Sequence, residues 1–233
     1  MSNPIKIAST KILSSSQRQE LESAHFEVYE ANFIKTESIE FDFPSSGGVS
    51  EGRGDLKIND NLIFTSQNAA QSILNYPKHK ELQVKNVFCV GIKTKALLEE
   101  NGFNVVVYMD YASDLAEIIT LIYSNESYTF FSGNLRKETL PKALKEANIQ
   151  FNEIQVYETT LTPHKLNIAV EGILFFSPSG VESYLSENKI KKETCFCIGE
   201  TTAEALFNVT KNIRIAENPS IEEVILEVIE EYK

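Results

Sequence analysis

The chain repeats itself, and this repeat constrains its fold more than any other feature. The segment Phe88-Cys-Val-Gly-Ile-Lys-Thr94 returns as Phe196-Cys-Ile-Gly-Glu-Thr-Thr202, with Phe196 standing 108 positions after Phe88. Upstream, Leu62-Ile-Phe-Thr-Ser66 resembles Ile173-Leu-Phe-Phe-Ser177, 111 positions later. A weaker third match, at 123 positions, pairs Ser9, Leu21 and Phe33 with Ser132, Leu144 and Val156. The repeat predicts two homologous lobes.

Short apolar runs alternate with helical periodicity along the whole chain. The runs are typical of buried strands, and they are Ile5–Ser9, Leu62–Thr65, Val87–Val90, Val105–Tyr108, Tyr128–Phe131, Ile154–Tyr157, Ile173–Phe176 and Cys195–Ile198. One helical face is formed by Leu115, Ile118, Ile119 and Ile122. A last helix is predicted after Ser220, with Glu223 completing a capping box. This alternation predicts an α/β protein with doubly wound parallel sheets.

Small polar residues follow several of the predicted strands. Thr65-Ser-Gln-Asn68 and Ser177-Pro-Ser-Gly180 lie between a strand and a helix. Gly91-Ile-Lys-Thr94 and Gly199-Glu-Thr-Thr202 place a glycine at a tight turn and a threonine at the expected N-cap. Free N–H groups at a helix start, with hydroxyls beside them, can bind an anion. The alternative is that these residues only cap helices.

Charge and missing motifs exclude several classes of function. A net charge of −11 argues against a duplex nucleic acid or an anionic membrane as partner. The first predicted strand is followed by no dinucleotide fingerprint, and the chain has no P-loop, nucleophile elbow or His-rich metal spacing. No apolar run reaches the roughly 20 residues that span a bilayer, so we expect a cytoplasmic protein.

The cysteines and one glycine-rich segment have ordinary interpretations. Cys89, Cys195 and Cys197 sit in apolar runs and are predicted to be buried strand residues, with metal or redox chemistry as the alternative. The Gly/Ser cluster within 44–61 is typical of a loop. It contains Arg53-Gly-Asp55, which is a short motif match and is not expected to act in adhesion.

Six blocks, taken in order, resemble the uroporphyrinogen-III synthase family over nearly the whole chain. They are Phe64-Thr-Ser-Gln-Asn-Ala, Cys89-Val-Gly-Ile-Lys-Thr, Ser132-Gly-Asn-Leu-Arg-Lys-Glu-Thr-Leu-Pro-Lys-Ala-Leu, Val156-Tyr-Glu-Thr, Phe176-Ser-Pro-Ser-Gly-Val and Ile198-Gly-Glu-Thr-Thr-Ala-Glu-Ala-Leu. The first block that many members carry, Arg-Pro-x-x-Gln, is absent here. In its place stands Ser9-Thr-Lys-Ile-Leu-Ser, where Lys11 and Gln17 are the available polar residues.

The resemblance implies two flavodoxin-like α/β lobes joined by a two-stranded linker, with the active site in the cleft between them. The first lobe would be discontinuous, formed by residues 1–33 and 166–233, and the second would comprise residues 39–157. Extended linkers would lie at 33–39 and 157–165.

The resemblance also implies a reaction. Hydroxymethylbilane, a linear tetrapyrrole with eight carboxylates, would close to uroporphyrinogen III with loss of water and inversion of ring D. No cofactor or metal is implied. The expected partner is this small-molecule substrate, the expected state is a monomer, and a transient contact with the preceding pathway enzyme is a further expectation.

The resemblance assigns the site residues block by block. Tyr157 would be the proton donor, and Arg136 and Lys137 would bind substrate carboxylates. The remaining substrate-binding residues would be Thr65, Ser66, Gln67, Asn68, Thr94, Gly133, Asn134, Ser177, Ser179, Gly180, Gly199, Thr201 and Thr202. The competing hypothesis is a non-catalytic, two-lobed cytoplasmic protein that binds a small anion or acts as a regulator.

Overall fold

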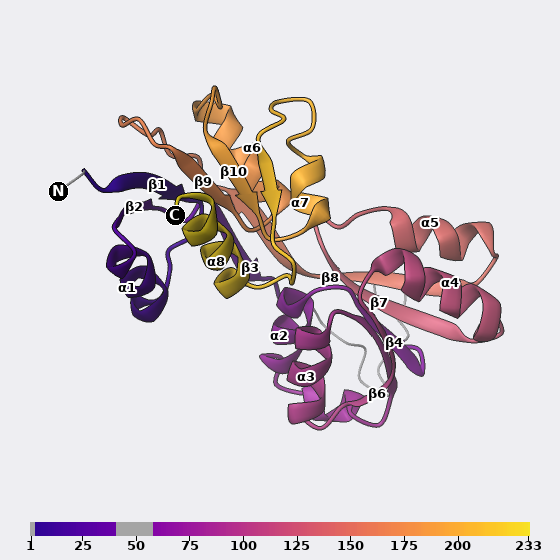
Figure 1. Cartoon of the computed structure of the whole chain (residues 1–233). Coiled ribbons are helices and arrows are strands. Elements are labelled where there is room, and N and C mark those ends of the chain that lie inside the picture. The colour runs from indigo at the N-terminus through magenta and orange to yellow at the C-terminus, as the bar shows by residue number, and fades with distance from the viewer. Residues whose placement is uncertain (1–2, 41–57) are drawn as a thin grey trace. The chain divides into compact units, whose positions relative to one another are not determined.

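The computed structural model describes residues 3–40 and 58–233 (Figure 1). Most of the predicted loop at 44–61, including Arg53-Gly-Asp55, lies outside the described residues. The chain forms two compact units. Unit 1 comprises Met1–Lys35 and Thr160–Lys233, and unit 2 comprises Thr36–Thr159. Unit 1 is therefore discontinuous, and the chain passes from one unit to the other twice.

Unit 1 is built on a five-stranded sheet whose recorded pairings are all parallel. Its strand order is β11-β10-β9-β1-β2. The strands are β1 (Ile5–Ser9), β2 (Phe26–Glu30), β9 (Gly172–Phe175), β10 (Thr194–Cys197) and β11 (Ile213–Ile215). The helices are α1 (Ser15–Ser23), α6 (Pro178–Glu187), α7 (Glu200–Glu204) and α8 (Ile221–Glu231).

Unit 2 is built on a six-stranded sheet with the order β3-β8-β7-β4-β5-β6. The pairings from β8 through β6 are parallel. The strands are β3 (Ile34–Ser38), β4 (Asn61–Phe64), β5 (Asn86–Val90), β6 (Asn104–Met109), β7 (Ser127–Gly133) and β8 (Gln150–Leu161). The helices are α2 (Gln67–Leu74), the 3₁₀ turn η1 (His79–Leu82), α3 (Ile92–Glu100), α4 (Ala112–Ile122) and α5 (Thr139–Glu146).

Helices cover both faces of each sheet. Because successive strand side chains point to opposite faces, Leu174 of β9 packs with α1 and α8, whereas its neighbour Phe175 packs with α6 and α7. In unit 2, Phe64 of β4 packs with α2 and α3, whereas Ile63 packs with α4 and α5. Figure 1 shows α2 and α3 on one side of the unit 2 sheet and α4 and α5 on the other. Double-sided burial explains why the strands are unbroken apolar runs. The predicted doubly wound α/β fold is confirmed.

The duplication is visible in the topology. The strand order β2-β1-β9-β10-β11 in unit 1 corresponds to β8-β7-β4-β5-β6 in unit 2, and every strand matched in sequence occupies the matching place. The chain fills these places in different orders. Unit 1 starts with β1 and β2, whereas their counterparts β7 and β8 come last in unit 2. The two units are therefore circular permutations of one arrangement.

Two strands were not predicted, β2 and β11, and both lie at the edges of the unit 1 sheet. The segment 33–39, expected to form one strand of the two-stranded linker, contains β3, which is an edge strand beside β8. An edge strand is covered less completely, so its sequence carries charges, as in Phe-Glu-Val-Tyr-Glu of β2. The predicted cap of α8 is half confirmed: the Ser220 hydroxyl accepts from the Glu223 N–H at 3.1 Å, while the Ser220 N–H donates to the Asn218 carbonyl.

The three cysteines are buried strand residues, as predicted. Burial raises the pKa of each thiol to about 12, so the thiolate that reacts with disulfide reagents is scarce at neutral pH. We expect a colorimetric thiol reagent at pH 8 to leave all three thiols unmodified in the folded protein and to modify all three in denaturant. Rapid modification of the folded protein would contradict their structural role.

Candidate functional site

Each sheet has one place where the chain's winding reverses direction. In unit 2 this switch point lies between β4 and β7, because β4 leads to β5 on one side and β7 leads to β8 on the other. In unit 1 it lies between β1 and β9. Ligands of doubly wound proteins bind outside the carboxyl ends of the strands at such points. Most predicted site residues lie just after these strand ends.

Tyr157 is held over the end of β7 by an irregularity in β8. Ser132 pairs with Gln155, but the next residue, Gly133, pairs with Tyr157, so Val156 is an extra residue in the ladder. Such a bulge re-aims the side chain that follows it. The Tyr157 ring then lies directly over Gly133, where an added Cβ would come within 2.3 Å of the ring. Only glycine leaves room for the ring at this position.

Ser66 connects Tyr157 to the start of α2. Its hydroxyl accepts the Ala69 N–H at 3.1 Å and caps the helix. The same hydroxyl donates to the phenolic oxygen of Tyr157 at 3.1 Å. The structure thus brings together three predicted site residues, Ser66, Gly133 and Tyr157. Ser66 and Tyr157 are 91 positions apart in the sequence.

Asn134 and Arg136 are bound within unit 2 itself. The Asn134 amide donates to the Thr159 carbonyl at 3.0 Å and accepts the Thr159 N–H at 2.8 Å. The Arg136 guanidinium donates to both carboxylate oxygens of Glu153, at 2.6 and 2.9 Å, and also to Glu138. Both side chains fix the loop after β7.

The carboxylate of Glu153 is the centre of this arrangement. Burial acts to raise its pKa, but hydrogen bonds from Arg136 and from Ser132 lower the pKa below its usual value. The Ser132 hydroxyl donates to Glu153 at 2.6 Å. Glu153 was not predicted as a site residue. Its counterpart Glu30, 123 positions earlier, was the available sequence signal.

The threonines of the repeated Gly-x-x-Thr segments do not cap helices, and this prediction is wrong. The N-caps of α3 and α7 are Gly91 and Gly199, which precede the threonines by three residues. Gly91 has a φ of 87°, a conformation that glycine adopts without strain. Thr94 and Thr202 lie in the first turn of each helix and are buried, both 3 % exposed. Thr201 is exposed.

The other predicted residues occupy the same strand ends. In unit 2, Thr65 is half-buried, whereas Gln67, Asn68 and Lys137 are exposed. In unit 1, Ser177 caps α6 by accepting the Gly180 N–H at 3.0 Å, and it contacts Ser179 at 3.1 Å.

Thr10 lies at the same unit 1 switch point and was not predicted. A Cβ on Gly180 would lie 3.5 Å from the Thr10 hydroxyl, so the end of β1 and the start of α6 lie close together. The Thr10 hydroxyl donates to the Leu174 carbonyl of β9 at 2.8 Å.

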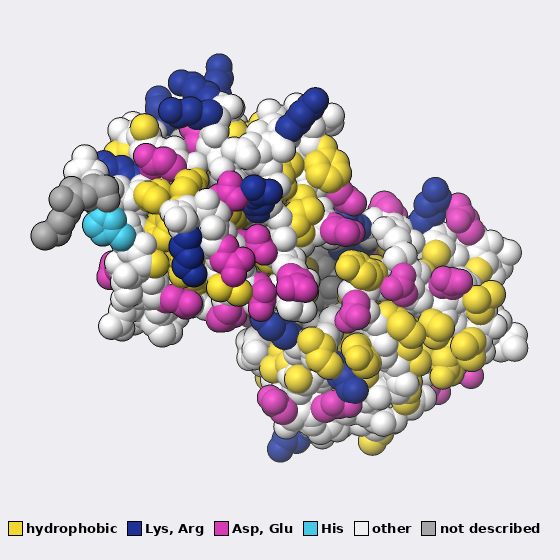
Figure 2. Space-filling view, viewed as in Figure 1, with side chains coloured by type: hydrophobic (Ala, Val, Ile, Leu, Met, Phe, Trp, Pro, Cys, Tyr) yellow, Lys and Arg dark blue, Asp and Glu magenta, His cyan; other side chains and the backbone are white. Residues whose placement is uncertain are grey.

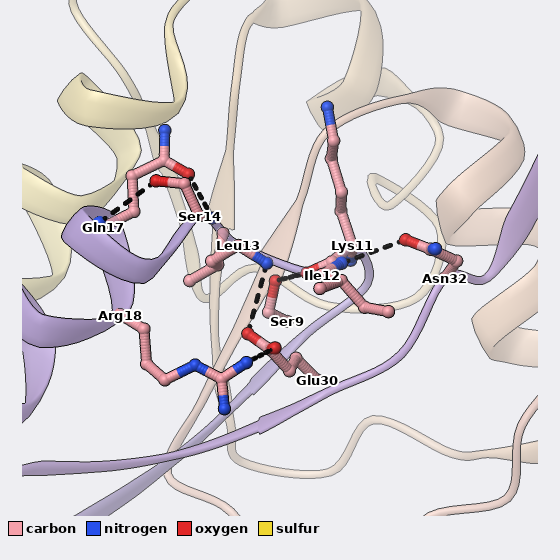
Figure 3. Close-up of polar contacts among 9 residues, drawn as sticks. All are labelled: Ser9, Lys11, Ile12, Leu13, Ser14, Gln17, Arg18, Glu30 and Asn32. Carbon is pink, nitrogen blue, oxygen red and sulfur yellow. Dashed lines mark hydrogen bonds and ion pairs between the residues drawn. The ribbon is translucent and has the colours of Figure 1, made fainter.

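The loop between β1 and α1 is a further part of this site (Figure 3). The Ile12 N–H donates to the Asn32 side chain at 3.0 Å, and the Leu13 N–H donates to Glu30 at 3.2 Å. Glu30 also pairs with Arg18. The loop is therefore held by the last residue of β2, Glu30, and by Asn32 just after that strand.

The structure also has a cavity that lies away from the carboxyl ends of the strands. It has a volume of about 630 Å³, lies in unit 1 and is lined by residues 166–170, Tyr184, residues 187–189 and residues 191–193, near the amino-terminal ends of β9 and β10. Among the described residues, no group of His, Cys, Asp and Glu is arranged to hold a metal. None of the helices in residues 3–40 and 58–233 combines the length and apolar character needed to cross a membrane. Figure 2 shows acidic side chains scattered over the visible face.

Comparison with known proteins identifies the family. The profile described as uroporphyrinogen-III synthase HemD matches residues 15–225. The chain belongs to the uroporphyrinogen-III synthase family. A curated relative, the porphyrin biosynthesis protein HemD of Ruminiclostridium josui, is 23 % identical over 192 residues. That match covers 72 % of this chain but only 37 % of the relative, so the chain spans well under half the relative's length.

Solved structures of the uroporphyrinogen-III synthase family share this fold. The uroporphyrinogen-III synthetase of Helicobacter pylori matches with a TM-score of 0.69 and 21 % identity, covering 98 % of this chain and 100 % of the other. A mutant uroporphyrinogen III synthase of Thermus thermophilus matches with a TM-score of 0.69 and 14 % identity, covering 97 % and 98 %. These likenesses confirm the predicted two-lobed α/β fold.

Replacing Gly133 tests the packing of the Tyr157 ring against this glycine. In Gly133→Ala the new methyl group collides with the Tyr157 ring, so the ring must move, at a cost of about 1–3 kcal/mol in the free energy of unfolding. Gly199→Ala is the matched control, because a Cβ there meets no atom within 4 Å among the described residues. Urea denaturation measures both. Equal stability of the two variants would contradict the described packing.

Proposed function

We propose that this chain closes hydroxymethylbilane to uroporphyrinogen III, with loss of water and inversion of ring D. Family membership over residues 15–225 supports this reaction class. The observation that carries the proposal is the phenol of Tyr157, seated on Gly133 and hydrogen-bonded by Ser66 at the switch point of unit 2. The proposal takes the enzyme to be a cytoplasmic monomer that needs no cofactor and whose partner is this small tetrapyrrole.

Loss of water requires a proton donor at the terminal hydroxymethyl group. When that hydroxyl accepts a proton, the C–O bond breaks, water leaves, and the pyrrole nitrogen's electron pair stabilises the azafulvene cation that remains. The cation then attacks the substituted carbon of the last ring to form a spiro intermediate, which rearranges before the macrocycle closes. Ring closure releases a proton, so the overall change is the loss of one water.

Tyr157 is arranged to donate that first proton. Because the Ser66 hydroxyl donates to the phenolic oxygen, the phenol's own proton is available for the leaving hydroxyl. Ser66 is itself fixed by the Ala69 N–H at the start of α2, where the helix dipole favours negative charge. The chain of hydrogen bonds therefore stabilises the oxygen from which the proton departs.

The activity is tested by product analysis. Purified protein is added to freshly prepared hydroxymethylbilane, the products are oxidised, and the type I and type III uroporphyrins are separated by chromatography. We expect type III to replace the type I isomer that forms spontaneously. Type I alone, at the spontaneous rate and with folded protein, would contradict the proposal and favour a non-catalytic binding protein.

Tyr157→Phe removes the donor while keeping the ring. We expect the rate of type III formation to fall about 100-fold, within the range usual for loss of a general acid. The thermal midpoint should stay close to that of the wild type, because the ring still packs on Gly133. A wild-type rate in a folded variant would remove Tyr157 from the mechanism.

Ser66→Ala tests whether the Tyr157 phenol depends on its partner. The variant loses both a helix cap and the bond to Tyr157, so we expect a stability loss of about 1 kcal/mol and a fall in kcat of roughly threefold to tenfold.

Ser220→Ala is the matched control, since the Ser220 hydroxyl caps α8 at the same 3.1 Å distance and lies outside the candidate site. It should lose similar stability and keep its kcat. Equal kcat values in the two variants would show that Ser66 only caps α2.

A further inference from the structure

The cavity of unit 1 lies at the opposite end of the strands from the candidate site. One wall comes from the segment 166–170, which leads into β9, and the other from the segment 187–193, which leads from α6 into β10. Because the strands of this sheet are parallel, their amino ends lie together and away from the switch point. The volume of about 630 Å³ is in the range usual for sites that bind small molecules.

Hydrogen bonds from Asn188 hold the two walls together. Its side-chain oxygen accepts the Leu166 N–H at 2.8 Å. Its side-chain amide donates to the carbonyl of His164 at 2.7 Å and to that of Tyr184 at 3.0 Å. The end of α6 is thereby fixed to the segment that precedes β9, so the cavity has a built frame.

Lysines gather on the wall between α6 and β10. Three line the cavity, Lys189, Lys191 and Lys192, and against Glu187 and Glu193 they leave the lining with one net positive charge in a chain of net charge −11. Figure 2 shows basic side chains gathered at the top of the view, on unit 1. Glu193 accepts the N–H groups of Lys191 and Lys192, at 2.6 and 2.9 Å, and fixes this turn. None of the three ammonium groups has an ion pair or hydrogen bond with a described residue.

Tyr184 is the buried polar side chain of the cavity. Its ring packs against Phe33 and Phe175, and the residue is 3 % exposed. Within the described part of the chain its phenolic oxygen has no hydrogen bond, although buried polar groups normally have a partner. The only described side-chain atom that is both closed off from solvent and unpartnered is the Ser183 hydroxyl, so the Tyr184 oxygen keeps access to solvent through the cavity that it lines.

The remaining lining is apolar. Leu166, Ile168 and Val170 line the cavity and pack on the core of unit 1. Burial, together with the charge of Glu193, raises the pKa of the Tyr184 phenol. The phenol therefore keeps its proton at neutral pH and can donate a hydrogen bond.

These features fit a small organic acid, with an apolar ring or chain that carries a carboxylate. The apolar wall can cover the body of such a ligand, while a phenol and ammonium groups are donors to its carboxylate. We propose that the cavity is a second ligand site, separate from the candidate active site, and that it binds a small apolar carboxylate through Tyr184, Lys191 and Lys192. The site lies wholly within unit 1 and does not depend on the proposed reaction.

Amide NMR spectra of the isotope-labelled full chain locate the binding. The probe is naphthoate, a double apolar ring with one carboxylate. We expect signals of residues 166–170 and 187–193 to shift to saturation, with a Kd of about 1 mM or lower. Naphthalenemethanol has a similar shape without the charge and should bind at least about tenfold more weakly. Equal affinities for the two compounds, or an absence of shifts in these two segments, would overturn the proposal.

Variants of the cavity test the assigned donors. Lys191→Gln/Lys192→Gln removes two charges, and Tyr184→Phe removes the hydroxyl while keeping the ring. We expect the Kd for naphthoate to rise about fivefold in each. The matched control is Lys78→Gln/Lys80→Gln, which removes two exposed charges from unit 2 and should leave the Kd unchanged.

The same spectra verify that each variant is folded. An unchanged Kd in either cavity variant, or an equal rise in the control, would overturn the proposal. Where Tyr184→Phe fails to fold, the exposed lysine pair decides the test alone.

Discussion

Burial of both sheet faces is the constraint on which each unit depends. Helices on the two sides favour apolar side chains along the interior strands, and in β9 Ile173, Leu174 and Phe175 follow one another without a polar interruption. The polar side chains of the candidate site accordingly lie where strands end. The same constraint explains why the cysteines, each inside such a run, are shielded from solvent.

The sequence was sufficient for features that depend on local pattern. Apolar runs indicated the interior strands because such a run is a property of neighbouring residues. The repeat indicated two lobes because matching segments can be recognised from the order of residues alone. Edge strands such as β11, only Ile213–Ile215, escaped prediction because they are short and lack the second apolar face. The N-cap prediction for Thr94 failed because residue type alone does not show which residue leaves the helical conformation.

The sequence predicted residues of the candidate site but not the contacts between them. Ser66 and Tyr157 could each be named from their blocks, but their hydrogen bond depends on a bulge in β8 that shifts the pairing of Gly133. Arg136 was assigned to substrate carboxylates, and its ion pair with Glu153 was not predicted. A side chain's partner across many residues depends on register, which a single sequence does not display.

The duplication has diverged where the chemistry is proposed. The counterparts of Gly133 and Tyr157, 123 positions earlier, are Thr10 and Ile34. The Thr10 hydroxyl donates to the Leu174 carbonyl and thereby joins β1 to β9. At equivalent positions of the two units, unit 2 therefore has the Tyr157 phenol, whereas unit 1 has a Thr10 hydroxyl that holds two strands together.

The permuted order of the strands also determines when each unit can be completed as the chain is synthesised. Unit 2 is one continuous stretch, Thr36–Thr159, and all its residues are synthesised before those of β9 to β11. Strand β1 is an interior strand of the unit 1 sheet, between β9 and β2, yet its neighbour β9 begins only at Gly172. The apolar side chains of β1 therefore stay uncovered by β9 on the nascent chain until the whole of unit 2 has been synthesised.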